Sequence, residues 1–134
     1  MTTLSSIAAV RRAAGSAGLI LAVIAGAASL ASAAPPPPAA VKEADQIFKS
    51  RCITCHGAGG KGDGAAAVAL NPKPRDLTDP AWQKSVDDAH IEKIILNGGP
   101  AVNKSPLMPA NPDLSAKPDV IHALRDMVRS LGTK

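Results

Sequence analysis

Apolar residues recur at intervals of three and four along several stretches of the chain, which is the spacing of one face of an α-helix. The predicted helices run from about Val41 to Arg51, from Ser85 or Asp87 as N-cap to the glycines at 98 and 99, and from Pro118 to Leu131. A shorter helix is predicted over 65–70. It must end there because the prolines at 72 and 74 cannot donate the backbone hydrogen bonds of a helix. No segment alternates with a period of two, so the pattern predicts an all-α domain.

The N-terminus carries a different kind of apolar stretch. Residues 13–30 contain no charge, follow Arg11 and Arg12, and precede an A-x-A sequence that ends at Ala33. This order is typical of a secretory signal peptide cleaved after Ala33, and it predicts a periplasmic protein. An uncleaved membrane anchor is the alternative, because the stretch is close to the ~20 residues that cross a bilayer. The predicted division is a signal peptide at 1–33, a Pro- and Ala-rich linker at 34–41, and one domain at 42–134.

Charge excludes one class of partner. The whole chain has 15 basic and 11 acidic residues, and removal of Arg11 and Arg12 leaves the exported part near +2. Its lysines are scattered among acidic residues, which is the pattern of a solvated surface. We therefore predict no nucleic-acid partner, and membrane association only through an uncleaved N-terminus.

Cys52, Cys55 and His56 form a C-x-x-C-H motif, the pattern of covalent c-type haem attachment. Each cysteine sulfur adds to one vinyl group of the haem, and the histidine becomes an iron ligand. Two other interpretations, a thioredoxin-like redox pair and half of a zinc site, fit less well. The chain has no other cysteine to complete a zinc site, and the motif follows a predicted helix instead of a strand. With one Phe, one Trp and no Tyr, the core also lacks aromatic bulk that a buried haem would supply.

A second iron ligand is expected in the proline-rich loop around Met108. Methionine thioether is a common partner of a histidine-ligated haem. Met127 lies on the apolar side of the last predicted helix, where packing explains it, whereas prolines on both sides of Met108 would hold a ligand at fixed reach. His90 and His122 are the competing ligands, and we expect both to be exposed surface residues.

Residues 57–64 form a glycine-rich loop that matches G-x-G-x-x-G. A dinucleotide site needs a strand before this motif and a helix opening from it, and neither is predicted here. We expect the glycines to let the backbone wrap closely around the haem edge.

With these motifs in this order, residues 40–132 resemble a class I monohaem cytochrome c of the small bacterial type. The resemblance implies an all-α cytochrome c fold, with three to five helices around one haem c bound through Cys52 and Cys55. It implies His56 and Met108 as the axial iron ligands. It also implies a proline carbonyl, from Pro72 or else Pro74, that accepts the second N–H of the histidine. Arg75 and Trp82 lie where related proteins contact a haem propionate, although a surface charge and a core aromatic are equally good interpretations.

The resemblance implies a periplasmic one-electron carrier that exchanges electrons with donor and acceptor proteins, a monomer and not an enzyme. One alternative is a haem subunit or domain of an oxidase or dehydrogenase complex. The other is a peroxidase-like haem enzyme or sensor, which would require that the methionine ligand be labile.

Overall fold

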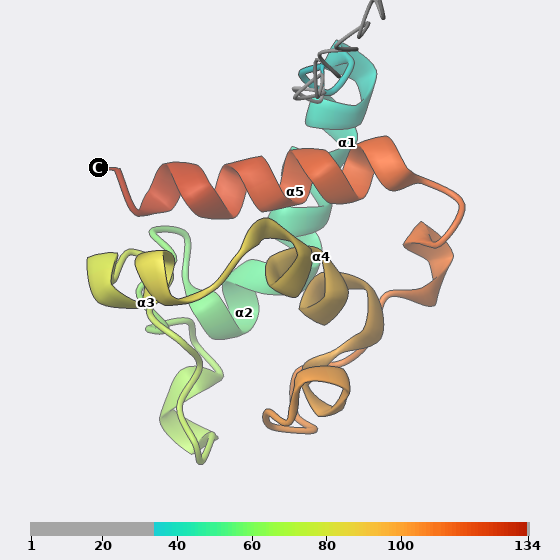
Figure 1. Cartoon of the computed structure of the whole chain (residues 1–134). Helices are drawn as coiled ribbons and strands as arrows, with labels where there is room; N and C mark the ends of the chain where they lie inside the picture. Colours follow the sequence, from blue (N-terminus) through green and yellow to red (C-terminus); the bar gives the residue numbers. More distant parts are fainter. Residues whose placement is uncertain (1–33, 134) are drawn as a thin grey trace, which may run out of the picture. The chain divides into compact units, whose positions relative to one another are not determined.

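The computed structural model describes residues 34–133. They contain helices and turns but no strand, which confirms the predicted all-α class (Figure 1). The elements are α1 (Pro38–Ile47), the π-helical turn η1 (Phe48–Cys52), α2 (Ile53–His56), the 3₁₀ turn η2 (Ala67–Ala69), α3 (Pro80–Ser85), α4 (Asp88–Asn97), the 3₁₀ turns η3 (Gly99–Val102) and η4 (Pro112–Leu114), and α5 (Pro118–Leu131). The predicted signal peptide lies outside the described residues. Within residues 34–133, no helix has the length and apolarity that a membrane crossing requires.

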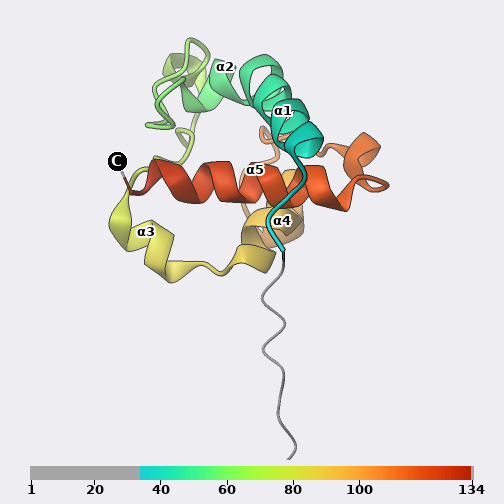
Figure 2. The same ribbon diagram turned by 90° about the horizontal axis from the view of Figure 1, so that it is seen from above.

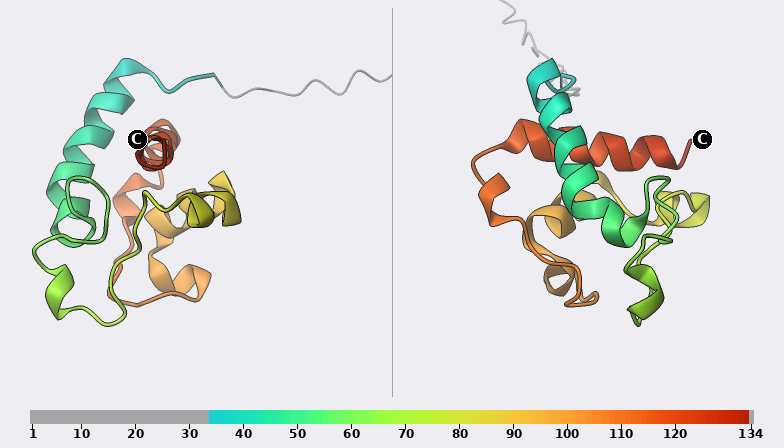
Figure 3. Two further views of the ribbon diagram at one scale, coloured as in Figure 1. Left: turned by 90° about the vertical axis from the view of Figure 1, so that its left-hand side faces the viewer. Right: turned by 180° about the vertical axis from the view of Figure 1, so that it is seen from behind.

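The first helix, predicted from Val41 to Arg51, begins earlier and ends earlier, at Ile47, but the helical path continues beyond the predicted end. It begins at Pro38, inside the segment predicted as linker, and Ala40 already belongs to the core. Beyond Ile47 the chain continues through η1 into α2, so that the helical path includes the whole C-x-x-C-H motif (Figure 3). In η1 the amide of Ile53 donates to the carbonyl of Phe48, five residues back. Such a π-turn rotates the residues that follow it relative to a regular helix and is frequent at functional sites.

The middle and last predicted helices are confirmed. Asp87 caps α4 by accepting a 2.7 Å hydrogen bond from the amide of His90, and Gly98 ends the helix at φ +75°. Ser85, the other predicted cap, instead ends α3. Helix α5 ends at Leu131, before Gly132, as predicted, and its apolar side is buried.

Helix α3 was not predicted. Asp79 caps it by accepting a 2.8 Å hydrogen bond from the amide of Ala81, and Pro80 occupies its first turn. An Asp–Pro pair at this position is a helix-start signal, but six residues are too few for a clear apolar period. The predicted helix over 65–70 is only the short 3₁₀ turn η2.

The core forms where α1 crosses α5 and α4 packs beside α5 (Figures 1 and 2). Ala44 is completely buried in α1, which lets the two helices approach closely. Leu114 and Ile91 are the largest fully buried side chains. Met127 packs against this core, as expected for a residue of the apolar stripe.

Candidate functional site

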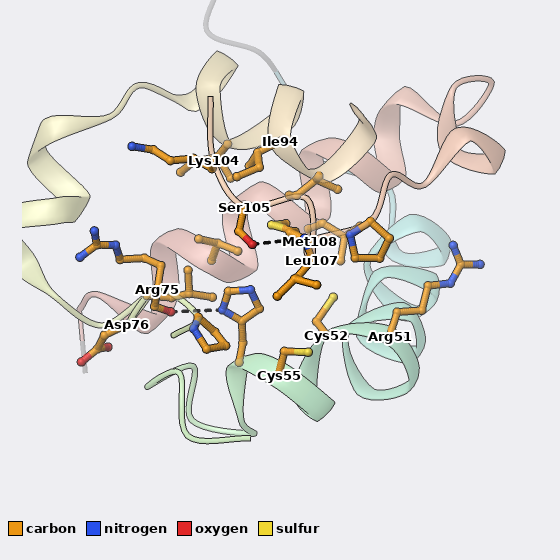
Figure 4. A pocket seen from close by; sticks show the side chains of 18 of the residues that line it. Arg51, Cys52, Cys55, Arg75, Asp76, Ile94, Lys104, Ser105, Leu107 and Met108 are labelled. Atoms are coloured by element: carbon orange, nitrogen blue, oxygen red, sulfur yellow. Dashed lines mark hydrogen bonds between the residues drawn. The ribbon is translucent and has the colours of Figure 1, made fainter. Parts of the chain in front are cut away.

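A cavity of about 730 Å³ opens between two walls of the domain, a volume typical of ligand pockets. The helical segment from Ile47 to His56 forms one wall, and α4 with the loop around Met108 forms the other (Figure 4). The remaining lining comes from residues 70–77, from α3 and its C-terminal end, and from Leu124 and Val128 of α5. All seven residues predicted for the cofactor site line this cavity: Cys52, Cys55, His56, Pro72, Arg75, Trp82 and Met108.

Cys52 and Cys55 are free thiols, both partly buried. Burial raises the pKa of Cys52 to about 11, an effect that Arg51 counteracts only in part. A thioredoxin-like cysteine needs the opposite shift, because its reactive form is the thiolate. Among residues 34–133 there is also no group of three His, Cys, Asp or Glu side chains that could hold a metal ion. The redox-pair and zinc interpretations therefore find no support in this part of the chain.

The backbone holds His56 in one tautomer. Its Nδ1 lies 3.2 Å from the carbonyl oxygen of Arg75, and because a carbonyl only accepts, Nδ1 carries the proton. Burial lowers the pKa of His56, and the hydrogen bond to Arg75 opposes this shift. The neutral ring keeps its Nε2 lone pair for a metal. The predicted acceptor for this N–H was the carbonyl of Pro72, with Pro74 next. In the structure the acceptor is instead the carbonyl of Arg75, and both prolines line the cavity.

The glycine-rich loop has a different role from the one predicted. No glycine of residues 57–64 lines the cavity. Instead, the loop folds back over α2, where Gly62 donates to the carbonyl of His56 at 2.9 Å and Gly64 donates to that of Cys55 at 3.1 Å. A Cβ on Gly64 would lie 2.4 Å from the carbonyl oxygen of Ile53. The glycines therefore permit close packing that caps the carbonyls at the end of the helix carrying the motif.

Met108 reaches the cavity from a loop that is attached to α4 and η3 at both ends. At one end, Gly99 donates to the carbonyl of Met108 at 3.0 Å and accepts from the amide of Lys104 at 2.8 Å. At the other end, the backbone amide of Asn111 donates to the carbonyl of Leu96 at 2.9 Å, and its side-chain amide donates to that of Ile95 at 2.8 Å. The sequence did not predict this role of Asn111, because no neighbouring residue indicates that its amides would donate to carbonyls of α4.

The competing histidines differ from the prediction that both are exposed. Both are partly buried, and His90 lines the cavity. His122 does not line it, and its Nε2 lies 3.8 Å from a carboxylate oxygen of Glu92.

These residues fit a covalently bound haem. The cavity is lined mainly by apolar side chains, two thiols suited to thioether formation lie on one wall, and an imidazole with a free nitrogen lone pair stands beside them. A thioether faces the cavity from the opposite wall.

Comparison with known proteins identifies the family of this chain. Residues 39–125 match the family described as cytochrome c oxidase, cbb3-type, subunit III, and the chain belongs to this family. It is therefore a c-type cytochrome domain that binds haem c covalently and transfers electrons.

A particular relative is the FixP subunit of the cbb3-type cytochrome c oxidase of Azorhizobium caulinodans, which is 39% identical over 94 residues. That match covers 69% of this chain but only 28% of the relative.

Proposed function

We propose that this domain would carry one electron at a time on a haem held through Cys52 and Cys55, with His56 and Met108 as the side chains that would bind its iron. The observation that carries the proposal is the placement of the C-x-x-C-H residues and Met108 around one apolar cavity. A bound haem would supply the redox chemistry, which is the gain and loss of one electron at its iron. The protein fixes the imidazole through the carbonyl of Arg75 and offers a thioether, which favours the ferrous state.

Attachment is tested by haem staining after denaturing electrophoresis of the exported protein. A covalent haem stays with the polypeptide, and the Cys52→Ser/Cys55→Ser double variant should lose the stain. His56→Ala tests the bond between the imidazole and the iron. This variant should retain the thioether-linked haem but change the optical spectrum of the haem. A stain that persists in the double variant would contradict attachment through these sulfurs.

We further propose that the domain serves a terminal oxidase as a haem subunit and not as a free carrier. The family description and the FixP relative both favour this setting. The test is mild detergent extraction of membranes from the native host, followed by chromatography. Comigration of the haem-stained chain with oxidase activity supports the subunit, whereas recovery in the salt-washed soluble fraction supports the free carrier.

The cellular location of the domain is part of the same proposal. Residues 1–33 would direct export to the periplasm, with cleavage after Ala33. Mass spectrometry of the exported protein tests this directly. A chain that begins near Ala34 supports cleavage, and an intact N-terminus supports an anchor.

A further inference from the structure

Arg51, the residue before Cys52, joins the two walls of the cavity. Its guanidinium donates to both carboxylate oxygens of Asp113 at 2.9 Å and to the side-chain oxygen of Asn111 at 3.0 Å. Within the part of the chain that the structure describes, no other side-chain hydrogen bond connects residues 38–56 with residues 103–114. The wall that carries the cysteines is thereby connected to the far end of the Met108 loop.

Asn111 makes this connection relevant to Met108. Its backbone and side-chain amides already hold the carbonyls of Leu96 and Ile95 in the last turn of α4, where carbonyls lack partners within the helix. The oxygen of the same side-chain amide accepts from Arg51. One residue therefore links α4, the end of the methionine loop and the segment before Cys52.

We propose that Arg51 is a positioning residue for Met108, which keeps the loop closed so that the thioether stays on the iron. The inference rests on the proposed ligand role of Met108. Figure 4 shows Arg51 beside Cys52 and Met108 on the opposite loop. The bidentate contact suits the planar guanidinium, which a lysine cannot reproduce.

The size of the effect is limited by solvent. The side chains of Arg51 and Asp113 are 44% and 50% exposed, and exposed ion pairs are individually weak. Two parallel hydrogen bonds and the shared Asn111 place this contact at the upper end of that range. Loss of Arg51 should therefore raise the population of the open loop about fivefold.

The test is titration of the ferric holo-protein with imidazole, which binds the iron only after the methionine sulfur has left. The apparent affinity is then proportional to the open fraction. Arg51→Gln and Asp113→Asn should each tighten imidazole binding about three- to fivefold, and Arg51→Lys should lie between them and the native protein. Asp113→Asn leaves the residue beside Cys52 unchanged, so haem attachment is not disturbed.

Lys117→Gln is the matched control. It removes the 2.6 Å ion pair with Glu43, which also connects α1 to the chain beyond the methionine loop and has similar exposure, 47% and 39%. This variant should lower the denaturant midpoint, by less than Arg51→Gln because only one contact is lost, while imidazole affinity stays unchanged.

Two results overturn the proposal and are distinguishable. If the native protein lacks the iron–methionine charge-transfer band, the proposed Met108 ligand fails and this inference fails with it. If the band is present but Arg51→Gln and Asp113→Asn bind imidazole like Lys117→Gln, the inference fails alone.

Discussion

Replacement of Gly99 by alanine tests how the Met108 loop is held. A Cβ at this position would lie 2.0 Å from the carbonyl oxygen of Ser105 and 3.0 Å from its carbonyl carbon. Real Cβ contacts essentially never fall below 3.0 Å, so the loop must withdraw by about 1 Å, a distortion that costs about 1–3 kcal/mol as overpacking. The obstacle is backbone and not a side chain that can rotate away. The withdrawal also strains the 3.0 Å hydrogen bond from Gly99 to the carbonyl of Met108.

Gly59→Ala is the control, because no atom outside the two adjacent residues lies within 4 Å of its added Cβ. Both variants lose the same glycine freedom in the unfolded chain, so their difference reports the clash alone. Guanidinium unfolding of the holo-proteins, followed by fluorescence of the single tryptophan, Trp82, measures stability. The iron–methionine charge-transfer band reports the loop. We expect Gly99→Ala to lose stability and weaken the band, and Gly59→Ala to do neither. Equal stability and equal bands in the two variants would refute the reasoning.

Three further predictions concern stability. Leu114→Ala should cost about 2–5 kcal/mol, because Leu114 is completely buried, whereas Val68→Ala should cost about 0.5 kcal/mol or less, because Val68 is 86% exposed and lies outside the cavity lining; equal midpoints would contradict this. Gln83→Leu should cost about 1–3 kcal/mol, because the side chain donates to two backbone carbonyls at 2.7 and 2.9 Å; a native-like unfolding midpoint would argue against it. Arg51 lowers the pKa of Asp113, so the stability difference between native and Arg51→Gln protein should be complete at neutral pH and shrink as the pH falls below 3.8, through the depressed value, to the part that the neutral Asn111 contributes; a difference in unfolding midpoints that is as large in stronger acid as at neutral pH would exclude the Asp113 pair as its source.

The sequence predicts those parts of the fold that local chemistry specifies. Helices α4 and α5 carry clear apolar periods together with a capping aspartate or a first-turn proline, and both were found close to their predicted bounds. The C-x-x-C-H motif and the isolated Met108 were enough to select residues that line one cavity, although they are far apart in the chain.

The remaining features depend on contacts that no local pattern records. The π-turn η1 leaves no mark in the apolar spacing before Cys52. The acceptor for His56 is a backbone carbonyl, and every residue has one, so side-chain identity could not distinguish Arg75 from Pro72. Arg51 and Asp113 lie 62 positions apart, and the period of apolar residues within one helix does not predict contacts at such a separation.

An optical spectrum of the purified exported protein, oxidised and reduced, with Met108→Ala beside it, tests the central claim most directly. The account predicts a low-spin haem whose weak iron–methionine charge-transfer band is present in the ferric native protein and absent from the variant. A high-spin haem without the band in the native protein would contradict it, because the coordination position assigned to Met108 would then be open.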